Sequence, residues 1–444
     1  MTELALGRLD ASEDGGWLIL SGANQPPGLV STQYDLCLSP EEAVNEHLGL
    51  NLRGSAAQTR SILETLEGLL NLSRQSVWSP LTLRLWSTER SRYLYSRIIA
   101  TRLETIGGHL ASHAGGSLRL NLRIQREGFF FGDSEALPLS NGSAGGITNG
   151  LTLFNHKDDD LGHDNWFTVQ TAELNLSYPA SLKIELENTT PGSDLGDFWV
   201  GGMTSSAEES RPILNLEAEG AVGGVIAASP GASGGKYSQY RWSGSAWTTL
   251  ATWTLGPVEV SQLRQRTVTP IARFFTPLAD ANLSLRLQIA QAGKVVWQSP
   301  ESNAQAGLGS LAMDPICLPL GSLPLVNFAY SHQLILQARH TAQGEHVLEL
   351  DDLLLLPHEP FVLFKTITGL PQLSKIVDDG TIGQNWSLRG GLELKTHRLI
   401  GGKLALQPCC RHHFWVFQCD TAQRAPIERT LKARAWFRRQ WRLP

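Results

Sequence analysis

The chain of 444 residues contains few of the features that mark secreted or membrane-spanning proteins. Its cysteines number five, too few and too unevenly spaced for a disulfide framework, so reduced thiols are expected: Cys37, Cys317, Cys409, Cys410 and Cys419. No apolar run approaches the roughly 20 residues that a membrane helix needs. Residues 1–16 show no basic stretch followed by an apolar core, so no secretory signal is expected. These absences predict synthesis in the cytoplasm without membrane insertion.

Charge is also scarce, because only 18% of the residues are Asp, Glu, Lys or Arg. The net charge of −5 gives no global reason to expect nucleic acid as a partner. Glycine is abundant, at 43 residues, and the chain is rich in turn formers. Low charge with many turns favours β-sandwich architecture over long solvated helices.

The charge is unevenly distributed along the chain. Residues 128–360 contain 24 acidic and 11 basic side chains, a net charge of −13, whereas the two flanking segments together carry +8. This asymmetry predicts that the two terminal segments form one unit and that an acidic insertion lies between them.

Local patterns predict one helix and several strands. Ser55 and Gln58 have the spacing of a capping box, and five apolar residues then follow at helical spacing, which predicts an amphipathic helix from Ser55 to about residues 73–76: Ile62, Leu63, Leu66, Leu69 and Leu70. Period-two alternation in 81–85, 118–125, 182–186, 283–289 and 334–336 predicts strands with one apolar face.

The order of these elements, followed by Arg126-Glu127-Gly128-Phe129-Phe130-Phe131-Gly132, resembles the N-terminal ring domain of distal tail (baseplate ring) proteins of long-tailed bacteriophages. The stretches 402–408 and 414–417 are similar to the closing strands of tail-ring and tube-like proteins. The resemblance covers about residues 30–135 and 360–444. It implies a β-sandwich or split-barrel ring domain with one helix, assembled as a homo-oligomeric ring, usually a hexamer, around the end of the tail tube.

A second resemblance lies in the middle of the chain. The stretches 216–221 and 228–237, with Glu-Ala-Glu in the first and Ser-Gly-Gly in the second, look like the opening of family 6/35-type carbohydrate-binding jelly rolls. That resemblance implies a structural calcium ion held by Glu217, Glu219 and a late carboxylate, Asp352, since calcium prefers oxygen ligands. The alternative is that these carboxylates are merely solvated on a strand face.

Other patterns suggest chemistry that their context does not favour. Gly231-Ala232-Ser233-Gly234-Gly235 satisfies the nucleophile-elbow string, but the β-prone residues 236–242 follow where that motif needs a helix. Cys409 and Cys410 lie near His412 and His413, yet adjacent residues on a strand point to opposite faces, so core cysteines with exposed histidines are expected instead of zinc ligands. With no paired catalytic carboxylates and no phosphate-binding glycine loop, we expect no enzymatic activity and no required cofactor.

Two groups of aromatic and basic residues suggest binding surfaces. Five aromatic residues of the middle segment are candidates for stacking against a glycan, with core packing as the alternative: Trp199, Tyr237, Tyr240, Trp242 and Trp247. Residues 421–444 contain seven basic side chains on an alternating strand pattern. We interpret that strand as a contact with a neighbouring subunit or tube protein, in preference to single-stranded nucleic acid.

Together these patterns predict a mainly β chain of four segments. Residues 1–135 and 361–444 form the two parts of the ring domain, 136–205 a β unit of the insertion, and 206–360 a jelly-roll domain. The implied function is a structural protein of the virion tail, with the tube protein, baseplate hub, tail fibres and a host-surface glycan as partners. The alternative is a secreted or surface glycan-binding protein, or an accessory module of a glycan-degrading enzyme.

Overall fold

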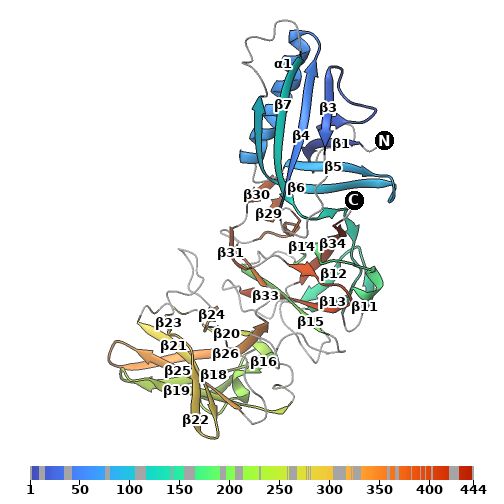
Figure 1. Cartoon of the computed structure of the whole chain (residues 1–444). Coiled ribbons are helices and arrows are strands. Elements are labelled where there is room, and N and C mark those ends of the chain that lie inside the picture. The colour runs from blue at the N-terminus through green and yellow to red at the C-terminus, as the bar shows by residue number, and fades with distance from the viewer. Residues whose placement is uncertain are drawn as a thin grey trace.

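The computed structural model describes most of the chain, and every structural statement below concerns the part it describes. Those residues are 3–9, 16–34, 43–75, 81–105, 117–141, 144–154, 166–190, 197–205, 214–229, 232–257, 259, 268–276, 278, 280, 282–303, 317–321, 323, 332–357, 361–365, 370–381, 383–390, 392–395, 397–401, 404–419 and 430–442. They form three β units that follow one another in space (Figure 1).

The N-terminal unit is a nine-stranded antiparallel sheet with one helix packed on it. The main path runs β2-β1-β5-β6-β7-β4-β3, and β8 and β35 join at its side. Its strands are β1 (Leu4–Arg8), β2 (Trp17–Ser21), β3 (Leu29–Tyr34), β4 (Ala43–Arg53), β5 (Leu81–Ser87), β6 (Arg92–Thr105), β7 (Ser117–Glu127), β8 (Phe130–Phe131) and β35 (Gln440–Trp441). Leucines from β1, β4, β5 and β7 form one buried core with the helix.

The helix α1 (Ala56–Gln75) has the predicted cap and apolar stripe. The Ser55 side-chain oxygen accepts a hydrogen bond from the Gln58 backbone N–H, and the Gln58 amide oxygen accepts one from the Ser55 N–H. Ile62, Leu66 and Leu70 are buried against the sheet. The capping box therefore starts the helix where the sequence pattern placed it.

The middle unit is a sandwich of a seven-stranded and an eight-stranded sheet. The first contains β10 (Leu139–Asn141), β11 (Ala144–Ile147), β13 (Trp166–Gln170), β15 (Asp197–Ser205), β27 (Phe361–Lys365), β31 (His397–Gly401) and β33 (Arg411–Cys419). The second contains β9 (Glu135–Ala136), β12 (Leu151–Phe154), β14 (Ala180–Asn188), β28 (Lys375–Asp379), β29 (Gln384–Arg389), β30 (Leu392–Lys395), β32 (Ala405–Leu406) and β34 (Thr430–Arg438). A second, separate core fills the space between them.

This pairing differs from the predicted division of the chain. Segment 136–205 is not a β unit of its own, because β14 pairs with β34 and both β13 and β15 pair with β33. Of the C-terminal segment, only β35 joins the N-terminal sheet, through β8. The sequence explains the difference, since 128–205 carries 11 acidic and 2 basic residues and 361–444 carries 14 basic and 5 acidic. The acidic segment and the basic segment therefore have complementary charges, as two parts of one sandwich can have.

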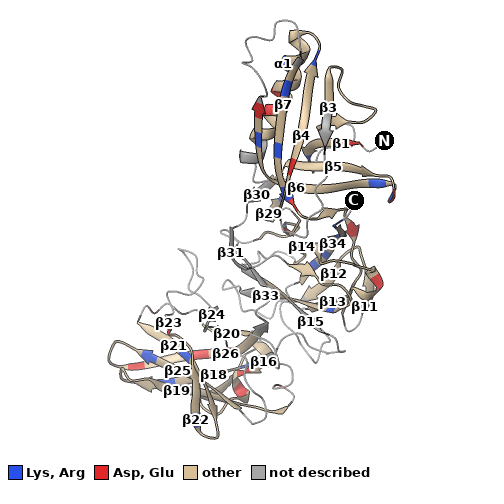
Figure 2. Ribbon diagram, in the orientation of Figure 1, with Lys and Arg blue, Asp and Glu red and all other residues tan. Residues whose placement is uncertain are grey.

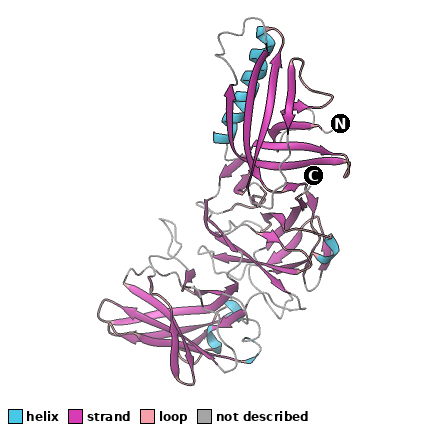
Figure 3. Cartoon of the chain, viewed as in Figure 1, coloured by secondary structure: helices cyan, strands magenta, loops and turns pink. Residues whose placement is uncertain are grey.

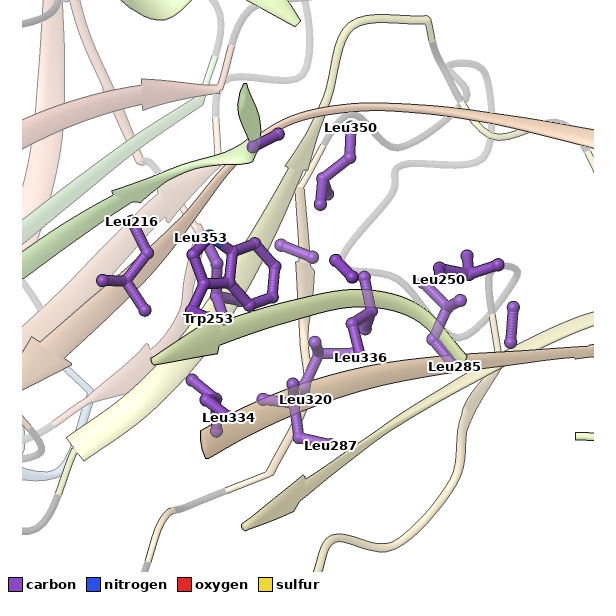
Figure 4. Packing of buried hydrophobic residues seen from close by; sticks show 14 of the residues in the cluster. Leu216, Leu250, Trp253, Leu285, Leu287, Leu320, Leu334, Leu336, Leu350 and Leu353 are labelled. Carbon is purple, nitrogen blue, oxygen red and sulfur yellow. The ribbon is translucent and has the colours of Figure 1, made fainter. Parts of the chain in front are cut away.

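The third unit, 214–357, is a sandwich of a six-stranded and a five-stranded sheet. The first contains β16 (Leu214–Glu217), β17 (Val225–Ala228), β18 (Lys236–Ser243), β20 (Val268–Phe274), β24 (Cys317–Pro319) and β26 (Glu345–Pro357). The second contains β19 (Thr248–Leu255), β21 (Leu283–Gln291), β22 (Lys294–Gln298), β23 (Ser302–Asn303) and β25 (His332–His340). Trp253 and leucines of both sheets meet in a third core (Figure 4).

The third unit is inserted within one pair of adjacent strands. β15 and β27 pair antiparallel, with Gly201 opposite Phe361, so the whole of 206–360 occupies the position of a hairpin loop. Both connections to the third unit therefore leave from one end of one strand pair. Such a path lets the insertion fold around its own core without crossing the middle sandwich.

The fold class is confirmed as mainly β, with α1 the one α-helix of regular length in the described ranges (Figure 3). No helix in these ranges combines the length and apolar character needed to span a membrane.

A buried ion pair lies beneath the N-terminal sheet. Glu46 on β4 and Arg126 on β7 are 0% and 1% exposed, and the Arg126 Nε donates to Glu46 Oε1 at 2.6 Å. The guanidinium also lies 4.3 Å from the centre of the Phe130 ring. Two charges on the core side of adjacent strands are tolerated only because they neutralise each other.

We therefore expect Glu46→Ala to lower the free energy of unfolding by about 3–5 kcal/mol, because Arg126 would stay buried without this carboxylate. The matched control is Glu104→Ala, which removes exposed pairs with Arg102 and Arg123 and should cost less than about 1 kcal/mol. The double variant Glu46→Leu with Arg126→Met should be much closer to wild type. Urea denaturation measures all three, and equal losses in Glu46→Ala and Glu104→Ala would contradict the expectation.

Candidate functional site

An acidic cluster lies where β16 meets β26 in the third unit. The register places Glu217 directly opposite Asp352, as the predicted convergence of an early and a late carboxylate requires. The Ser233 hydroxyl and the Asn215 amide both donate to Glu217 Oε1, at 2.9 and 2.7 Å. The Ser233 backbone N–H donates to Asp351 at 2.8 Å. The Ser-Gly-Gly turn is thus bound to both strands that carry the carboxylates.

Asp352 is held by a cation that the sequence patterns did not single out. Arg273 on β20 donates to both carboxylate oxygens of Asp352, and its Nε lies 3.3 Å from Asp351. Asp352 is completely buried. The available signal was a lone arginine in the apolar strand 268–274, since an arginine in that position needs a carboxylate partner.

The cluster holds more negative charge than Arg273 neutralises. Burial, reinforced by the charge of Asp352, raises the pKa of Glu217 from 4.5 to about 8. Burial also raises the pKa of Asp352 to about 6, although Arg273 opposes that shift. At neutral pH the Glu217 carboxyl is therefore protonated in the protein alone.

The cluster fits the predicted calcium ion only in part. The Oε2 atoms of Glu217 and Glu219 are buried and without a hydrogen-bond partner in the described structure, and Gly234, in a left-handed conformation, lies beside both carboxylates. Asp352, in contrast, is occupied by Arg273. No group of three His, Cys, Asp or Glu side chains within the described ranges could hold a metal ion. Calcium, with its six to eight oxygen ligands, would need backbone or water oxygens besides Glu217 and Glu219, and it stays a prediction.

The five aromatic candidates for glycan contact separate into different environments. Tyr240 and Trp242 are only 2% and 7% exposed and belong to the core of the third unit, so they offer no surface to a glycan. Tyr237 stacks on Phe275 with ring centres 4.1 Å apart. Trp247 is half-buried beside two arginines. The side chain of Trp199 lies outside the described residues, although its backbone belongs to β15.

The basic C-terminal strand finds its partners in its own chain. Arg434 on β34 contacts Glu185 and Glu187 of β14 at 2.6 and 2.8 Å, and Arg439 contacts Glu135 at 2.8 Å. The hydrogen bonds from Arg434 to these glutamates raise its pKa although burial opposes the shift. Arg434 and Arg439 thus pair with carboxylates of their own chain, and the contact of this strand with a neighbouring subunit stays a prediction.

The cysteines and histidines of 409–413 have the opposite burial from that expected. Cys409 is exposed in the turn before β33, whereas His412 and His413 are 2% and 0% exposed. β33 is covered on both faces, which buries neighbouring side chains that point in opposite directions. His412 accepts a hydrogen bond from the Gln407 N–H, and burial lowers its pKa, so the ring is neutral.

One cavity of about 540 Å³ lies at the junction of the first two units. Its lining includes Arg90, Glu135, Tyr178, Arg439 and Trp441. Charges of both signs line it, and Arg90 lies 4.9 Å from the centre of the Trp441 ring. No sequence pattern pointed to it, because its walls come from segments more than 250 residues apart.

No family model matches the chain, and no curated protein matches it. Among solved structures it is similar to the Dit protein of phage SPP1, described as a hub adsorption apparatus in phages infecting Gram-positive hosts, with 10% identity, 99% of this chain and 89% of that chain covered, and a TM-score of 0.21. It is also similar to a chain of the phage P2 baseplate in its activated conformation with Ca, at 8% identity, with 95% of this chain and 99% of that chain covered and a TM-score of 0.27. A third similar structure is a VP2 protein of infectious bursal disease virus, at 10% identity, with 69% of this chain and 76% of that chain covered and a TM-score of 0.20. TM-scores this low do not establish a shared fold.

The acidic cluster predicts a dependence of stability on pH. Because the pKa of Glu217 is about 8 in the folded protein and 4.5 is its ordinary value, the unfolded chain ionises first as pH rises. Stability contributed by the protonated form is complete below about pH 4.5 and is lost as pH rises to about 8. Glu217→Gln should lack this loss and should melt at a higher temperature than wild type at pH 8.

Added calcium tests whether the ionised Glu217 carboxylate binds a metal ion. If Glu217 and Glu219 hold the ion, millimolar Ca²⁺ at pH 8 should raise the melting temperature of wild type and leave that of Glu217→Gln unchanged. Differential scanning calorimetry measures both proteins, with Mg²⁺ as the control ion. An equal calcium response in the two proteins would place the ion elsewhere.

Proposed function

We propose that the chain is a structural protein of a bacteriophage tail that forms a ring at the distal end of the tail tube and carries the third unit as an attachment domain. One observation carries this proposal: 206–360 replaces a single hairpin loop between β15 and β27. The first two units can therefore serve as an assembly platform while the third extends from one side of them (Figure 1).

The organisation of the platform supports this role. The strand order and capped helix on which the resemblance to distal tail ring domains depends are present in the N-terminal unit. The C-terminal segment returns to complete the middle sandwich and ends in β35 on the first sheet, which links the two units. A subunit of this kind can repeat one heterologous interface until a ring closes, as a hollow tail requires.

The interactions described above are of the kind that stabilise a scaffold. Two buried arginines form ion pairs that join strands, Arg126 with Glu46 and Arg273 with Asp352. Ser233, in the nucleophile-elbow string, is bound to Glu217 and Asp351 and is followed by strand β18 in place of a helix. We therefore propose a role in assembly without catalysis, in which the tube protein and baseplate hub contact the platform.

The proposal predicts that the platform assembles without the insertion. Residues 206–360 are replaced by a glycine-serine linker of about six residues, because β15 continues for four residues beyond Gly201, the partner of Phe361. We expect this variant to form closed rings with the same number of subunits as the full chain. Light scattering gives the mass, and negative-stain imaging shows whether outward knobs disappear.

The full-length protein is the control in the same buffer. A monomeric variant beside ring-forming full-length protein would show that the insertion contributes to the ring. Full-length protein that stays monomeric at its highest soluble concentration, alone and with purified tail tubes, would contradict ring formation.

A further inference from the structure

The outer face of the five-stranded sheet in the third unit carries an ordered row of polar side chains. The register places Thr249 of β19 opposite Gln337 of β25, and Gln337 opposite Arg286 of β21. The Arg286 Nε donates to the Gln337 amide oxygen at 2.9 Å, and the Gln337 amide nitrogen donates to Thr249 Oγ1 at 3.2 Å. This chain of hydrogen bonds fixes the orientation of the Arg286 guanidinium.

The fixed orientation leaves one edge of Arg286 available. Its Nε is used by Gln337, and within the described residues its two terminal nitrogens have no hydrogen-bond partner. That pair of nitrogens is the fork with which arginine binds the two oxygens of a carboxylate or phosphate.

A second guanidinium lies beside the first. Trp247 holds Arg286 at 4.0 Å and Arg339 at 5.0 Å from the centre of its indole ring. The Nε of Arg339 is buried and without a hydrogen-bond partner in the described structure. Burial and the charge of Arg339 both lower the pKa of Arg286, an unfavourable proximity of like charges.

The site contains an excess of one positive charge. Arg339 Nη2 contacts Glu301 at 2.8 Å, and this is the one carboxylate that either arginine contacts in the described part of the chain. An indole ring stabilises cations on its face but does not neutralise them. Two fixed guanidiniums with one carboxylate are therefore complementary to one further anionic group.

We propose that Arg286 and Arg339 bind the carboxylate or phosphate group of an acidic saccharide and that Gln337 and Thr249 contact its hydroxyl groups. Trp247 is a positioning residue that keeps the two guanidiniums together. This inference rests on the proposed function and deepens it, because it names the class of ligand that the third unit binds. It can be tested apart from ring formation.

The surroundings favour a saccharide over other anions. Amide and hydroxyl side chains adjoin the cations, and the exposed Gln298, whose amide oxygen accepts a hydrogen bond from buried Gln288, adds a further amide one step along the same sheet. Figure 2 shows few basic residues on this sheet besides the neighbouring arginines of β21 and β25. Residues 206–360 carry 13 acidic and 9 basic residues, so a long polyanion such as nucleic acid would be repelled by most of this surface.

The test is isothermal titration calorimetry on the full chain with two acidic saccharide probes, oligogalacturonate for the carboxylate and maltohexaose phosphorylated at O6 for the phosphate. Neutral maltohexaose and hexaglutamate serve as the uncharged saccharide and the acidic peptide. We expect wild type to bind at least one acidic saccharide, and the more tightly bound probe identifies the anionic group.

Arg286→Gln should weaken that binding about tenfold or more, and Arg286→Lys, which keeps the charge without the fork, should weaken it less. The matched control is Arg241→Gln, which removes an exposed arginine paired with Glu345 on the other sheet and should leave affinity within about twofold. Thermal melting shows whether each variant is folded. If Arg286→Gln does not fold, the comparison is made with Arg286→Lys.

Three results would overturn the inference: no binding of either acidic saccharide, equal loss in Arg241→Gln, or hexaglutamate binding as tightly as the saccharides. Light scattering on the same samples separates this inference from the proposed function. Rings without saccharide binding reject the binding site alone, and saccharide binding without rings rejects the tail assembly alone.

Discussion

The pairing of an acidic strand with a basic strand more than 240 residues away holds the platform together. In β14 and β34, Glu185 lies opposite Arg434 and Glu187 lies opposite Lys432, and Lys375 of β28 contacts both glutamates from the other side. Oppositely charged residues on adjacent strands stabilise the pair, and like charges in these positions would destabilise it. This register also places Leu182, Ile184 and Leu186 in the core, because a slip by one residue would move all three to the opposite face.

That long-range pairing explains how the chain accommodates a large insertion. The strands around the insertion, β15 and β27, pair directly with each other and lie between β33 and β31 in one sheet. Loop-closure entropy rises only slowly with loop length, and here the loop gains its own core of leucines and Trp253. The third unit therefore adds little strain to the unit that carries it. A binding face on it can also change sequence without disturbing the platform.

The sequence predicted local structure better than it predicted which segments are neighbours. The capped helix α1 and the alternating strands β7, β14 and β21 follow from hydrophobic spacing and capping, which act over a few residues. The assignment of 136–205 to a separate unit was wrong. A count of charged residues shows that this segment and 361–444 differ in net charge, but it does not show that the two segments pair in one sandwich. The prediction that strand β5 has only one buried face was also wrong. Thr82 and Arg84 on its second face are also buried, since Trp17 and Tyr93 lie over the Arg84 guanidinium.

The candidate sites show the same limit. The convergence of Glu217 and Asp352 was predicted from a resemblance, and the register of β16 and β26 confirms that they are adjacent. Arg273, which occupies Asp352, and the pair of Arg286 and Arg339 were not predicted, because an isolated arginine in a strand does not reveal its partner. Three arginine sites now differ in their balance of charge. Arg126 faces one carboxylate and Arg273 faces two, whereas Arg286 and Arg339 share only Glu301. The positive charges of Arg126 and Arg273 are thus balanced by carboxylates of the protein itself. The third lies at the surface with an unmatched cation, and that imbalance is the physical reason for assigning the binding of an external anion to this sheet.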